Sequence, residues 1–371
     1  MKKINILMLT TYPSVKGPFR KIVPLLSEAL RKKGCSVVEV PWGRRHDAES
    51  AGEKIKNRFA DILRIRSILL QNRFDIMFIH NGAHDLRGIA RDIPLLMATR
   101  GLYRQAVLQI HGADLSFITE SGHIARKALN YLLCSQLDGV ILSSQLELEV
   151  FSQFVRNTRF FVADDIYQKK NFPDNLPVPQ EWNLPAGRPV IFFAARLIPE
   201  KGIQVLLAAI PLVLEQVECH FLIAGNGPLE SEVRKRLSEP PYKGHASWVG
   251  YLDWDHLELA YSLTTVFTLP TYYFEGFPAV IQDALGYGLP IVTTATRGMA
   301  DHLVDGVHAR MVPPQDPAAL ADALIDLLQD PSRCRSMSVA NLKKAEDFSP
   351  EVVAPQYIRI LEELLGYGKS N

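Results

Sequence analysis

The sequence predicts an α/β protein built from two doubly wound domains that face each other across a cleft. The chain has 371 residues, which is too long for one compact core and fits two domains of roughly 150–190 residues. In both halves, short apolar strands alternate with helical segments, a pattern typical of a mostly parallel sheet covered on both faces. A polar, proline-rich segment from Asp164 to Arg188 separates the two halves and indicates a linker.

The first half, residues 1–170, carries the pattern of one domain. Its predicted elements are strand Ile4–Thr10, a helix ending near Lys33, strand Val37–Pro41, helix Glu53–Arg73, and strands Ile76–His80, Ala106–His111, Gly139–Leu142 and Phe160–Val162. In the long helix, six apolar residues recur at helical spacing and predict its buried face: Ile55, Phe59, Ile62, Leu63, Leu69 and Leu70. Arg66 falls within that face, so its guanidinium must extend to solvent or find a partner.

The alternation restarts after the linker, residues 171–188, and defines a second domain, residues 189–349. Its predicted elements are strand Val190–Ala194, helix Ile203–Leu214, strand His220–Ala224, a helix from Pro228, strand Ala246–Val249, helix Asp255–Ser262, strand Val266–Leu269, and helices Pro317–Leu328 and Ser332–Glu346. A last helix, Pro350–Leu365, lies within residues 350–371, and we expect it to pack back on the first domain. Sheets of this kind bind ligands at the carboxyl ends of their strands.

Charge is divided unevenly along the chain. Residues 1–170 carry 26 Lys and Arg against 16 Asp and Glu, or +10, and residues 171–371 carry 15 against 24, or −9, which together give the net charge of +1. One interpretation is that the first half meets an anionic partner, such as a membrane surface, an acidic glycan or a phosphorylated acceptor. The other is that a basic and an acidic domain attract each other across the cleft.

The cysteines and the amino terminus both favour a cytoplasmic protein. The four cysteines are scattered, with no Cys-x-x-Cys spacing, so neither a zinc site nor a disulfide framework is indicated. The apolar stretch that begins at Ile4 is too short for a signal peptide, and no segment approaches the ~18 apolar residues of a spanning helix.

The segment from Thr268 to Thr294 contains the most suggestive local pattern. It predicts a short strand, a turn with Glu275, a helix and a second strand. Asp283 lies eight residues after Glu275, about two helical turns, so both carboxylates are expected on one side. Backbone amides at Gly276, together with the helix dipole, suit an anion. The alternative is a helix with an acidic start and a solvated aspartate.

Three further loops at strand ends carry candidate ligand-binding residues. Arg196 and Lys201 lie five residues apart between a strand and a helix, which suits a diphosphate, although they can also be surface charges. Gly225 belongs to a Gly-x-Gly turn, which is weak evidence for a nucleotide because the full Gly-x-Gly-x-x-Gly is absent. Tyr251 follows a glycine at the next strand end.

Taken together, these motifs give the chain a specific resemblance. The order AARLIPEKG, IAGNGPLE, VGYL and PTYYFEGFPAVIQDALGYGLPIV resembles the retaining glycosyltransferases of family 4, which have the GT-B fold of two Rossmann-like domains. The resemblance covers essentially the whole second domain and is weaker in the first. The family's hallmark is a Glu, seven residues and a second Glu. Here these positions are Glu275 and Asp283.

The resemblance implies donor-binding roles in the second domain. Arg196 and Lys201 would bind the diphosphate of a nucleotide-sugar and neutralise its charge as the sugar departs. Asp283 would accept hydrogen bonds from the ribose hydroxyls. The sugar hydroxyls and the distal phosphate would be held by Glu275 and the backbone of Gly276, Phe277 and Pro278. The base would contact Tyr251 and the neighbouring backbone at Leu252, and Gly225 would let the nucleotide lie close.

In the first domain, the resemblance implies roles for one glycine and one histidine. Gly17 would approach the phosphate, and His111 would lie near the reacting carbon of the donor. His111 also ends an apolar strand at the predicted cleft and precedes a glycine, although a lone strand-end histidine is more often structural. His80 ends another strand and is an acceptor-side candidate.

Several positions depart from the family pattern. Asp283 is one methylene shorter than glutamate. The first-domain loop has a single Gly17 followed by proline, and the end of the first domain has Asp164-Asp165 where relatives have Asn-Gly. Asp253-Trp254-Asp255 has the Asp-x-Asp form of manganese-dependent transferases, but it opens a predicted helix, where aspartate is a good cap.

We therefore expect a metal-independent retaining glycosyltransferase of hexosyltransferase type, with no cofactor and no nucleic-acid partner. It would transfer a sugar from a UDP-, GDP- or ADP-linked donor to a glycan or lipid-linked acceptor in surface glycan, polysaccharide or glycolipid synthesis. The alternatives are a non-catalytic partner of a glycan-assembly complex and a dinucleotide-dependent oxidoreductase. The basic residues of the Glu53–Arg73 helix suggest peripheral contact with an anionic membrane.

Overall fold

The computed structural model describes most of the chain. The described residues are 3–15, 17, 19–46, 48–83, 91–113, 115, 119, 131, 133, 135–155, 158–169, 176–273, 276–296 and 298–367. Contacts divide the chain into two compact units. Unit 1 comprises Met1–Gln168, Phe274–Phe277 and Phe348–Asn371, and unit 2 comprises Lys169–Tyr273 and Pro278–Asp347.

Unit 1 is built on a parallel sheet in which the described residues form six strands in the order β2-β1-β3-β4-β5-β6. The strands are β1 (Asn5–Thr10), β2 (Ser36–Pro41), β3 (Phe74–Ala83), β4 (Tyr103–Ala113), β5 (Gly139–Leu142) and β6 (Phe160–Val162). Alternate residues of β1 point to opposite faces: Ile6 and Met8 enter one apolar cluster, and Leu7 and Leu9 enter the other. The sheet is therefore buried on both sides.

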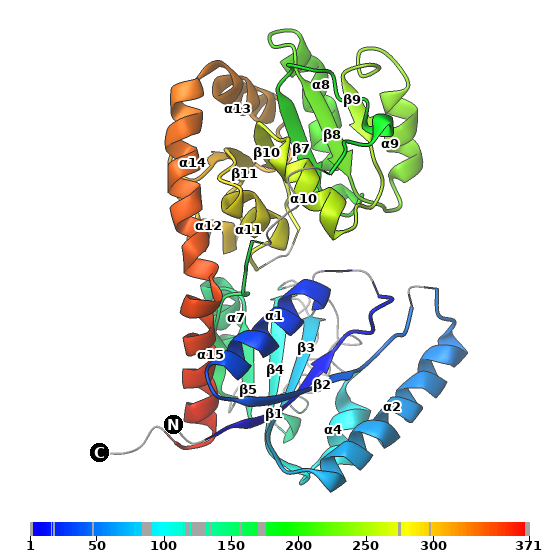
Figure 1. The fold of residues 1–371 in the computed structure, drawn as a ribbon, viewed down its shortest axis with the longest axis vertical. Coiled ribbons are helices and arrows are strands. Elements are labelled where there is room, and N and C mark those ends of the chain that lie inside the picture. Colours follow the sequence, from blue (N-terminus) through cyan, green and yellow to red (C-terminus); the bar gives the residue numbers. More distant parts are fainter. Residues whose placement is uncertain are drawn as a thin grey trace. The chain divides into compact units, whose positions relative to one another are not determined.

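Helices cover both faces of this sheet (Figure 1). Helices α1 (Phe19–Lys32) and α15 (Pro350–Leu364) pack on one face, where Leu26 and Tyr357 join the apolar cluster of Ile6 and Met8. Helices α2 (Ala51–Gln71), α4 (Ile93–Thr99) and α7 (Gln145–Phe154) pack on the other. The last helix of the chain thus completes the core of unit 1.

Unit 2 repeats the architecture with a second parallel sheet, in which the described residues form six strands in the order β12-β11-β10-β7-β8-β9. The strands are β7 (Val190–Ala194), β8 (His220–Ala224), β9 (Ala246–Trp248), β10 (Val266–Leu269), β11 (Ile291–Thr294) and β12 (Arg310–Val312). The helices are α8 (Ile203–Leu214), α9 (Glu230–Leu237), α10 (Trp254–Ser262), α11 (Ala279–Gly286), α12 (Gly298–His302), α13 (Pro317–Gln329) and α14 (Pro331–Ala345). Two parallel α/β units confirm the predicted fold class.

Helix α2 corrects one part of the sequence prediction. Ile62 packs against the core and Leu69 is buried, but the other four residues of the predicted apolar face are exposed, at 73% for Ile55, 64% for Phe59, 54% for Leu63 and 62% for Leu70. The buried face is instead centred on Asp61, Ile65 and Leu69. Arg66 stays exposed and donates to the carbonyl of Ala98.

The buried face of α2 contains the carboxylate of Asp61, one oxygen of which is hydrogen-bonded. Asp61 Oδ1 accepts hydrogen bonds from the Tyr12 hydroxyl at 2.6 Å and from Arg64 Nη2 at 2.9 Å. Burial, and then the bond to Asp61, raises the pKa of the Tyr12 phenol. This polar contact fixes the rotation of the helix and leaves an apolar stripe in solvent.

Candidate functional site

In unit 2, two loops meet where β7 and its neighbour β10 end. A single 3-10 turn, Pro199–Lys201, follows β7. Its Glu200 carbonyl accepts from Tyr272 N at 2.8 Å and from Thr271 Oγ1 at 3.0 Å. Gly202 begins α8 at φ +80°, and a Cβ there would lie 2.1 Å from the Pro270 carbonyl oxygen. Glycine is therefore required for these loops to close on each other.

This closure places two cations over one aromatic ring. The Arg196 guanidinium carbon lies 5.3 Å from the ring centroid of Tyr273, and Lys201 Nζ lies 4.6 Å from it. Arg196 is exposed, whereas Lys201 is buried, with 8% of its surface exposed. A ring face attracts cations and orders them without neutralising their charge. The structure thus brings together the two residues that the sequence predicts as a diphosphate clamp.

The sequence motifs do not point to Tyr273 as a functional residue. The available signal is its place in the run Tyr272-Tyr273 directly before the Glu275 motif. Its pairing with Arg196, far away in the chain, depends on the neighbouring positions of β7 and β10.

The glycine turn after β8 has a structural explanation. Gly225 has φ +130°, and a Cβ there would lie 1.8 Å from the Ala195 carbonyl oxygen. Its N–H donates to the Gly250 carbonyl at 2.6 Å, and its carbonyl accepts from Trp248 Nε1 at 2.8 Å. Gly225 is thus needed for the loops after β7, β8 and β9 to pack, and the structure shows its backbone engaged with protein.

The loop after β9 leaves a candidate base-binding side chain in solvent. Tyr251 is exposed and Leu252 is partly exposed. Asp253 then caps α10, because its Oδ1 accepts from His256 N at 3.0 Å and from His256 Nδ1 at 2.7 Å. The interpretation of this Asp-x-Asp as a helix cap is confirmed.

Only part of the Glu275 motif can be compared with the sequence prediction. Helix α11 begins only at Ala279, after its N-cap Pro278, and Glu275 lies outside the described residues. The eight residues from Glu275 to Asp283 therefore do not form two helical turns, and that spacing argument does not apply. The placement of both carboxylates on one side concerns a residue outside the described part of the chain and stays a prediction. Asp283 itself is buried in α11.

The residues between these two carboxylates fall in different units. Gly276 and Phe277 group with unit 1, where the Phe277 ring stacks on Phe348 at a centroid distance of 5.0 Å. Pro278 groups with unit 2.

In unit 1, His111 lies within a chain of contacting side chains. Its Nδ1 lies 2.8 Å from Asp165 Oδ1, and its Nε2 lies 3.0 Å from His80 Nδ1. His80 Nε2 in turn lies 2.9 Å from Met8 Sδ. The two histidines that the sequence predicts as separate candidates are therefore one connected group.

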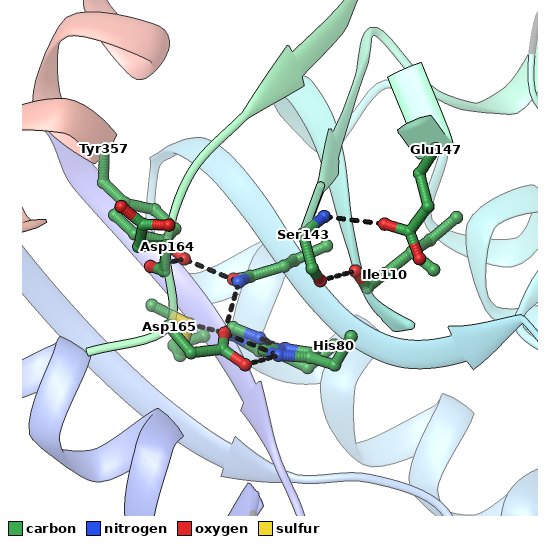
Figure 2. A network of polar contacts seen from close by, with 10 residues as sticks. His80, Ile110, Ser143, Glu147, Asp164, Asp165 and Tyr357 are labelled. Atoms are coloured by element: carbon green, nitrogen blue, oxygen red, sulfur yellow. Dashed lines mark hydrogen bonds and ion pairs between the residues drawn. The ribbon is translucent and has the colours of Figure 1, made fainter. Parts of the chain in front are cut away.

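A second branch of this network involves Gln109 and helix α15 (Figure 2). Gln109 Nε2 donates to Asp165 Oδ1 at 3.0 Å and to the Tyr357 hydroxyl at 2.5 Å, and that hydroxyl donates to the Asp164 carbonyl at 3.1 Å. Burial raises the pKa of Tyr357 well above its ordinary value. The phenol is therefore a neutral donor.

Close by, Glu147 anchors the ends of β4 and β5 (Figure 2). It is fully buried, and its carboxylate accepts from Ala113 N at 2.8 Å and from Ser143 N at 2.9 Å. Ser143 Oγ donates to the Ile110 carbonyl at 2.7 Å. These bonds tie the end of β5 to β4 at Ile110 and Ala113, which lie before and after His111 in the same strand.

Gly17 lies before α1 and, unlike Gly225, has no neighbouring atoms that a side chain would meet. Its φ is +132°, and a Cβ there would meet no atom within 4 Å. Phe19, the first residue of α1, packs against the His111 ring with centroids 4.8 Å apart. Glycine is required here by backbone conformation and leaves open space beside the loop.

Comparison with known proteins shows that the unit 2 loops lie in a region similar to a known protein family. Residues 176–344 match the family model described as Glycosyl transferases group 1. Those residues include the Arg196–Lys201 loop, the Gly225 turn, Tyr251 and Asp283. The matched region belongs to the group 1 glycosyl transferases. This confirms the resemblance that the sequence motifs indicate.

Relatives and solved structures agree with this group 1 glycosyl transferase region. A phosphatidyl-myo-inositol mannosyltransferase of Mycolicibacterium smegmatis is 32% identical over 184 residues, 49% of this chain and 47% of that protein. The chain thus matches about half the length of this relative. A sucrose-phosphate synthase of Thermosynechococcus elongatus has a TM-score of 0.77 at 19% identity, over 99% of this chain and 100% of the other.

A third comparison concerns a structure with ligands. The Anabaena protein HepE, in complex with UDP and glucose, has a TM-score of 0.72 at 14% identity, over 97% of this chain and 100% of the other. These likenesses establish that the fold is GT-B.

Two other kinds of site are absent from the described part of the chain. None of its helices is long and apolar enough to cross a membrane. Nor do its described residues contain a cluster of three or more His, Cys, Asp or Glu that could hold a metal ion.

Proposed function

We propose that the protein is a retaining glycosyltransferase that moves a sugar from a nucleotide-diphosphate sugar to an acceptor hydroxyl. The observation that carries this proposal is the pair of cations, Arg196 and Lys201, ordered on the Tyr273 ring inside the region that matches the group 1 family. Two cations at strand ends are suited to the diphosphate of such a donor, whose charge rises as the sugar leaves.

The reaction would proceed on one face of the sugar. The bond from the anomeric carbon to the donor diphosphate breaks, the acceptor oxygen bonds to the same face of that carbon, and the departing diphosphate takes the acceptor proton. Arg196 and Lys201 stabilise the negative charge that develops on the diphosphate. No protein carboxylate moves a proton in this scheme.

The remaining candidates bind the donor. Asp283 contacts the ribose hydroxyls, and Tyr251, with the backbone at Leu252, contacts the base. Glu275 and the backbone of Gly276, Phe277 and Pro278 hold the sugar and the distal phosphate. Gly17 leaves room for a phosphate beside α1, and Gly225 shapes the turn that borders the nucleotide.

The names of similar proteins support the substrate classes. The mannosyltransferase of M. smegmatis acts on a phosphatidyl-myo-inositol, and HepE binds UDP and glucose. We therefore propose a hexose donor linked to UDP, GDP or ADP, and a glycan or lipid-linked acceptor in glycolipid or polysaccharide synthesis. The clamp consists of side-chain cations, so we propose that no metal is required.

The test is a turnover screen over UDP-, GDP- and ADP-hexoses, with the Lys201→Ala variant compared with Lys243→Ala. Lys243 is exposed in the same unit and has no proposed role. Loss of one transition-state donor typically lowers turnover roughly 10²–10³-fold, so Lys201→Ala should lose activity on that scale and Lys243→Ala should keep it. Equal turnover in the two variants would refute the clamp. The same assay with a chelator should show unchanged turnover.

Peripheral membrane contact is a second part of the proposal, and the corrected face of α2 supports it. Ile55, Phe59, Leu63 and Leu70 form an exposed apolar stripe, with Lys54 and Lys56 exposed beside it. Apolar side chains next to basic ones suit insertion at an anionic lipid surface, where each buried residue and each lysine contributes.

Vesicle sedimentation at low salt tests this contact. The protein should partition with vesicles that contain anionic lipid, and the double variant Phe59→Ser with Leu63→Ser should lose this partitioning. Val339→Ser removes an equally exposed apolar residue from α14 and serves as the control. Equal partitioning onto neutral and anionic vesicles, or no effect of the double variant, would dispose of the proposal.

A further inference from the structure

The polar chain from Asp165 through His111 and His80 to Met8 imposes a particular distribution of protons. All four residues belong to unit 1 and lie at or near the ends of β1, β3, β4 and β6. The His111 side chain is 5% exposed and the Asp165 side chain 11% exposed, and His80 is buried. Because water has little access, each contact must be satisfied within the protein.

The two ends of the chain accept hydrogen bonds and cannot donate them. A thioether sulfur has no hydrogen, so the contact of 2.9 Å between His80 Nε2 and Met8 Sδ requires a proton on Nε2. At the other end, Asp165 receives two N–H groups, one from Gln109 and one from His111 Nδ1, as suits an ionised carboxylate. His111 Nδ1 therefore carries a proton.

The contact between His111 Nε2 and His80 Nδ1 then allows only one placement of the proton. His80 is buried, and this burial lowers the pKa of His80 well below its ordinary value. A neutral His80 with its proton on Nε2 has a bare Nδ1, which can only accept. The contact of 3.0 Å between the rings is then a hydrogen bond donated by His111 Nε2.

The opposite assignment leaves a buried group unsatisfied. If His80 carried its proton on Nδ1 and donated it to His111, both rings would be neutral. His80 Nε2 would then face the Met8 sulfur with lone pair against lone pair at 2.9 Å. A buried polar atom left in that state is unfavourable.

We propose that Asp165 and His80 hold His111 as an imidazolium, which places a fixed positive charge beneath the start of α1. The Phe19 ring packs directly on this imidazole, and Gly17 leaves open space just before it. An imidazolium there adds to the positive end of the helix dipole and favours an anionic group at the Gly17 loop. This consequence rests on the proposed function, in which that anion is the donor diphosphate.

Asp165 and His80 are thus positioning residues that act through His111. Asp165 occupies one of the two positions where the chain has Asp164-Asp165 in place of Asn-Gly. The titratable groups that face the pair among the described residues are His80 on β3 and, through Gln109, Tyr357 on α15.

Nitrogen NMR of histidine-labelled protein tests the charge state without any turnover. The signals of His111 and His80 are assigned with the His111→Asn and His80→Asn variants. At pH 7.5 both ring nitrogens of His111 should show shifts of protonated nitrogen, and His80 should be the neutral Nε2–H tautomer. A neutral His111 at that pH would overturn the proposal, whether or not the enzyme is active.

Two variants test the cause of the charge. Met8→Leu keeps the apolar volume and removes the sulfur acceptor, so His80 should change to the Nδ1–H tautomer and His111 should become neutral. Asp165→Asn should also give a neutral His111, and Asp164→Asn is the control that should leave the imidazolium in place. Retention of the imidazolium in both Met8→Leu and Asp165→Asn would refute the roles given to their partners.

The consequence for the donor is measured by kinetics on an active nucleotide-sugar. Loss of one partly screened charge should raise the donor KM by roughly tenfold in Asp165→Asn and in Met8→Leu, with a smaller change in kcat. Asp164→Asn should match the unmodified protein. An unchanged KM in variants whose His111 is shown to be neutral would overturn the link to the donor and leave the Arg196–Lys201 clamp unaffected.

Discussion

The two units treat their cations in opposite ways. In unit 2, Arg196 is exposed and shares the Tyr273 ring with Lys201. In unit 1, the His111 imidazole is enclosed, with both ring nitrogens bonded to protein. A cation on an aromatic face can turn its charge to a ligand, whereas an enclosed one acts only through its field. The first kind of site can bind directly, and the second can only bias binding nearby.

The sharpest test of this contrast is the buried carboxylate beside the unit 1 network. Glu147→Leu removes the acceptor of the Ala113 and Ser143 amides and leaves both unsatisfied in the core. At roughly 1–3 kcal/mol for each orphaned donor, unit 1 should lose about 4 kcal/mol of stability, measured by urea unfolding. Glu147→Gln keeps one acceptor and should lose about half as much. A loss below that of Glu147→Gln would show that the amides find other partners.

A buried histidine in unit 2 gives the next largest effect, through pH. Burial, followed by the charges of His245 and Arg188, lowers the pKa of His220 to about 4 from 6.5. Between these two values the unfolded chain binds a proton that the folded chain does not, so stability falls as pH decreases from 6.5 to about 4 and is constant in this respect above 6.5.

The loss expected from His220 is about 3 kcal/mol, since each pKa unit corresponds to about 1.4 kcal/mol. Urea unfolding of His220→Gln at a series of pH values should show a flatter dependence than the unmodified protein. His46 is exposed, so His46→Gln should keep the original slope. Parallel pH profiles for all three proteins would contradict the assignment.

The smallest effect is expected at the ring of Tyr273, which Arg196 and Lys201 share. Tyr273→Leu removes the ring beneath two cations, each worth about 0.5–1 kcal/mol, so donor affinity should fall roughly 5- to 30-fold with little change in stability. Tyr273→Phe keeps the ring face and should bind donor almost as the unmodified protein does. Calorimetric titration with the preferred nucleotide-sugar distinguishes the two. Equal affinity of the Phe and Leu variants would show that the ring does not order the cations.

Much of the fold follows from local patterns in the sequence. The strands β7, β8 and β10 and the helix α8 have the predicted bounds, because each is an apolar run closed by glycine, proline or polar residues. Helix α7 is not predicted by apolar spacing. Its Glu147 is buried by hydrogen bonds to distant amides, and a count of apolar positions treats that residue as exposed.

The prediction of which face of α2 is buried is wrong for a similar reason. Its inward face includes Asp61, whose Oδ1 accepts a hydrogen bond from Tyr12 in another part of the chain. Periodicity alone assigns the interior to Ile55, Phe59, Leu63 and Leu70, all of which are exposed. A tertiary polar contact thus decided which of two apolar stripes was buried.

In the candidate site, too, residues within one loop are predictable from the sequence, and their partners from distant elements are not. Arg196 and Lys201 are visible in the sequence because they occupy one loop with a family motif. Their partner Tyr273, and the partner Asp165 of His111, come from elements that only the sheet order brings close. Sequence patterns identify residues within a loop, and long-range pairing identifies what holds them.

The return of the last helix has a consequence for how the chain folds during synthesis. Residues from Phe348 onward belong to unit 1, and Val353, Tyr357 and Leu361 complete its apolar cluster on the α1 face. Unit 2, although later in the sequence, emerges entirely before that segment does. Unit 2 can therefore finish folding on the ribosome while one face of the unit 1 sheet is covered by α1 but not yet by α15, so the amino-terminal half of the protein is the last to be completed.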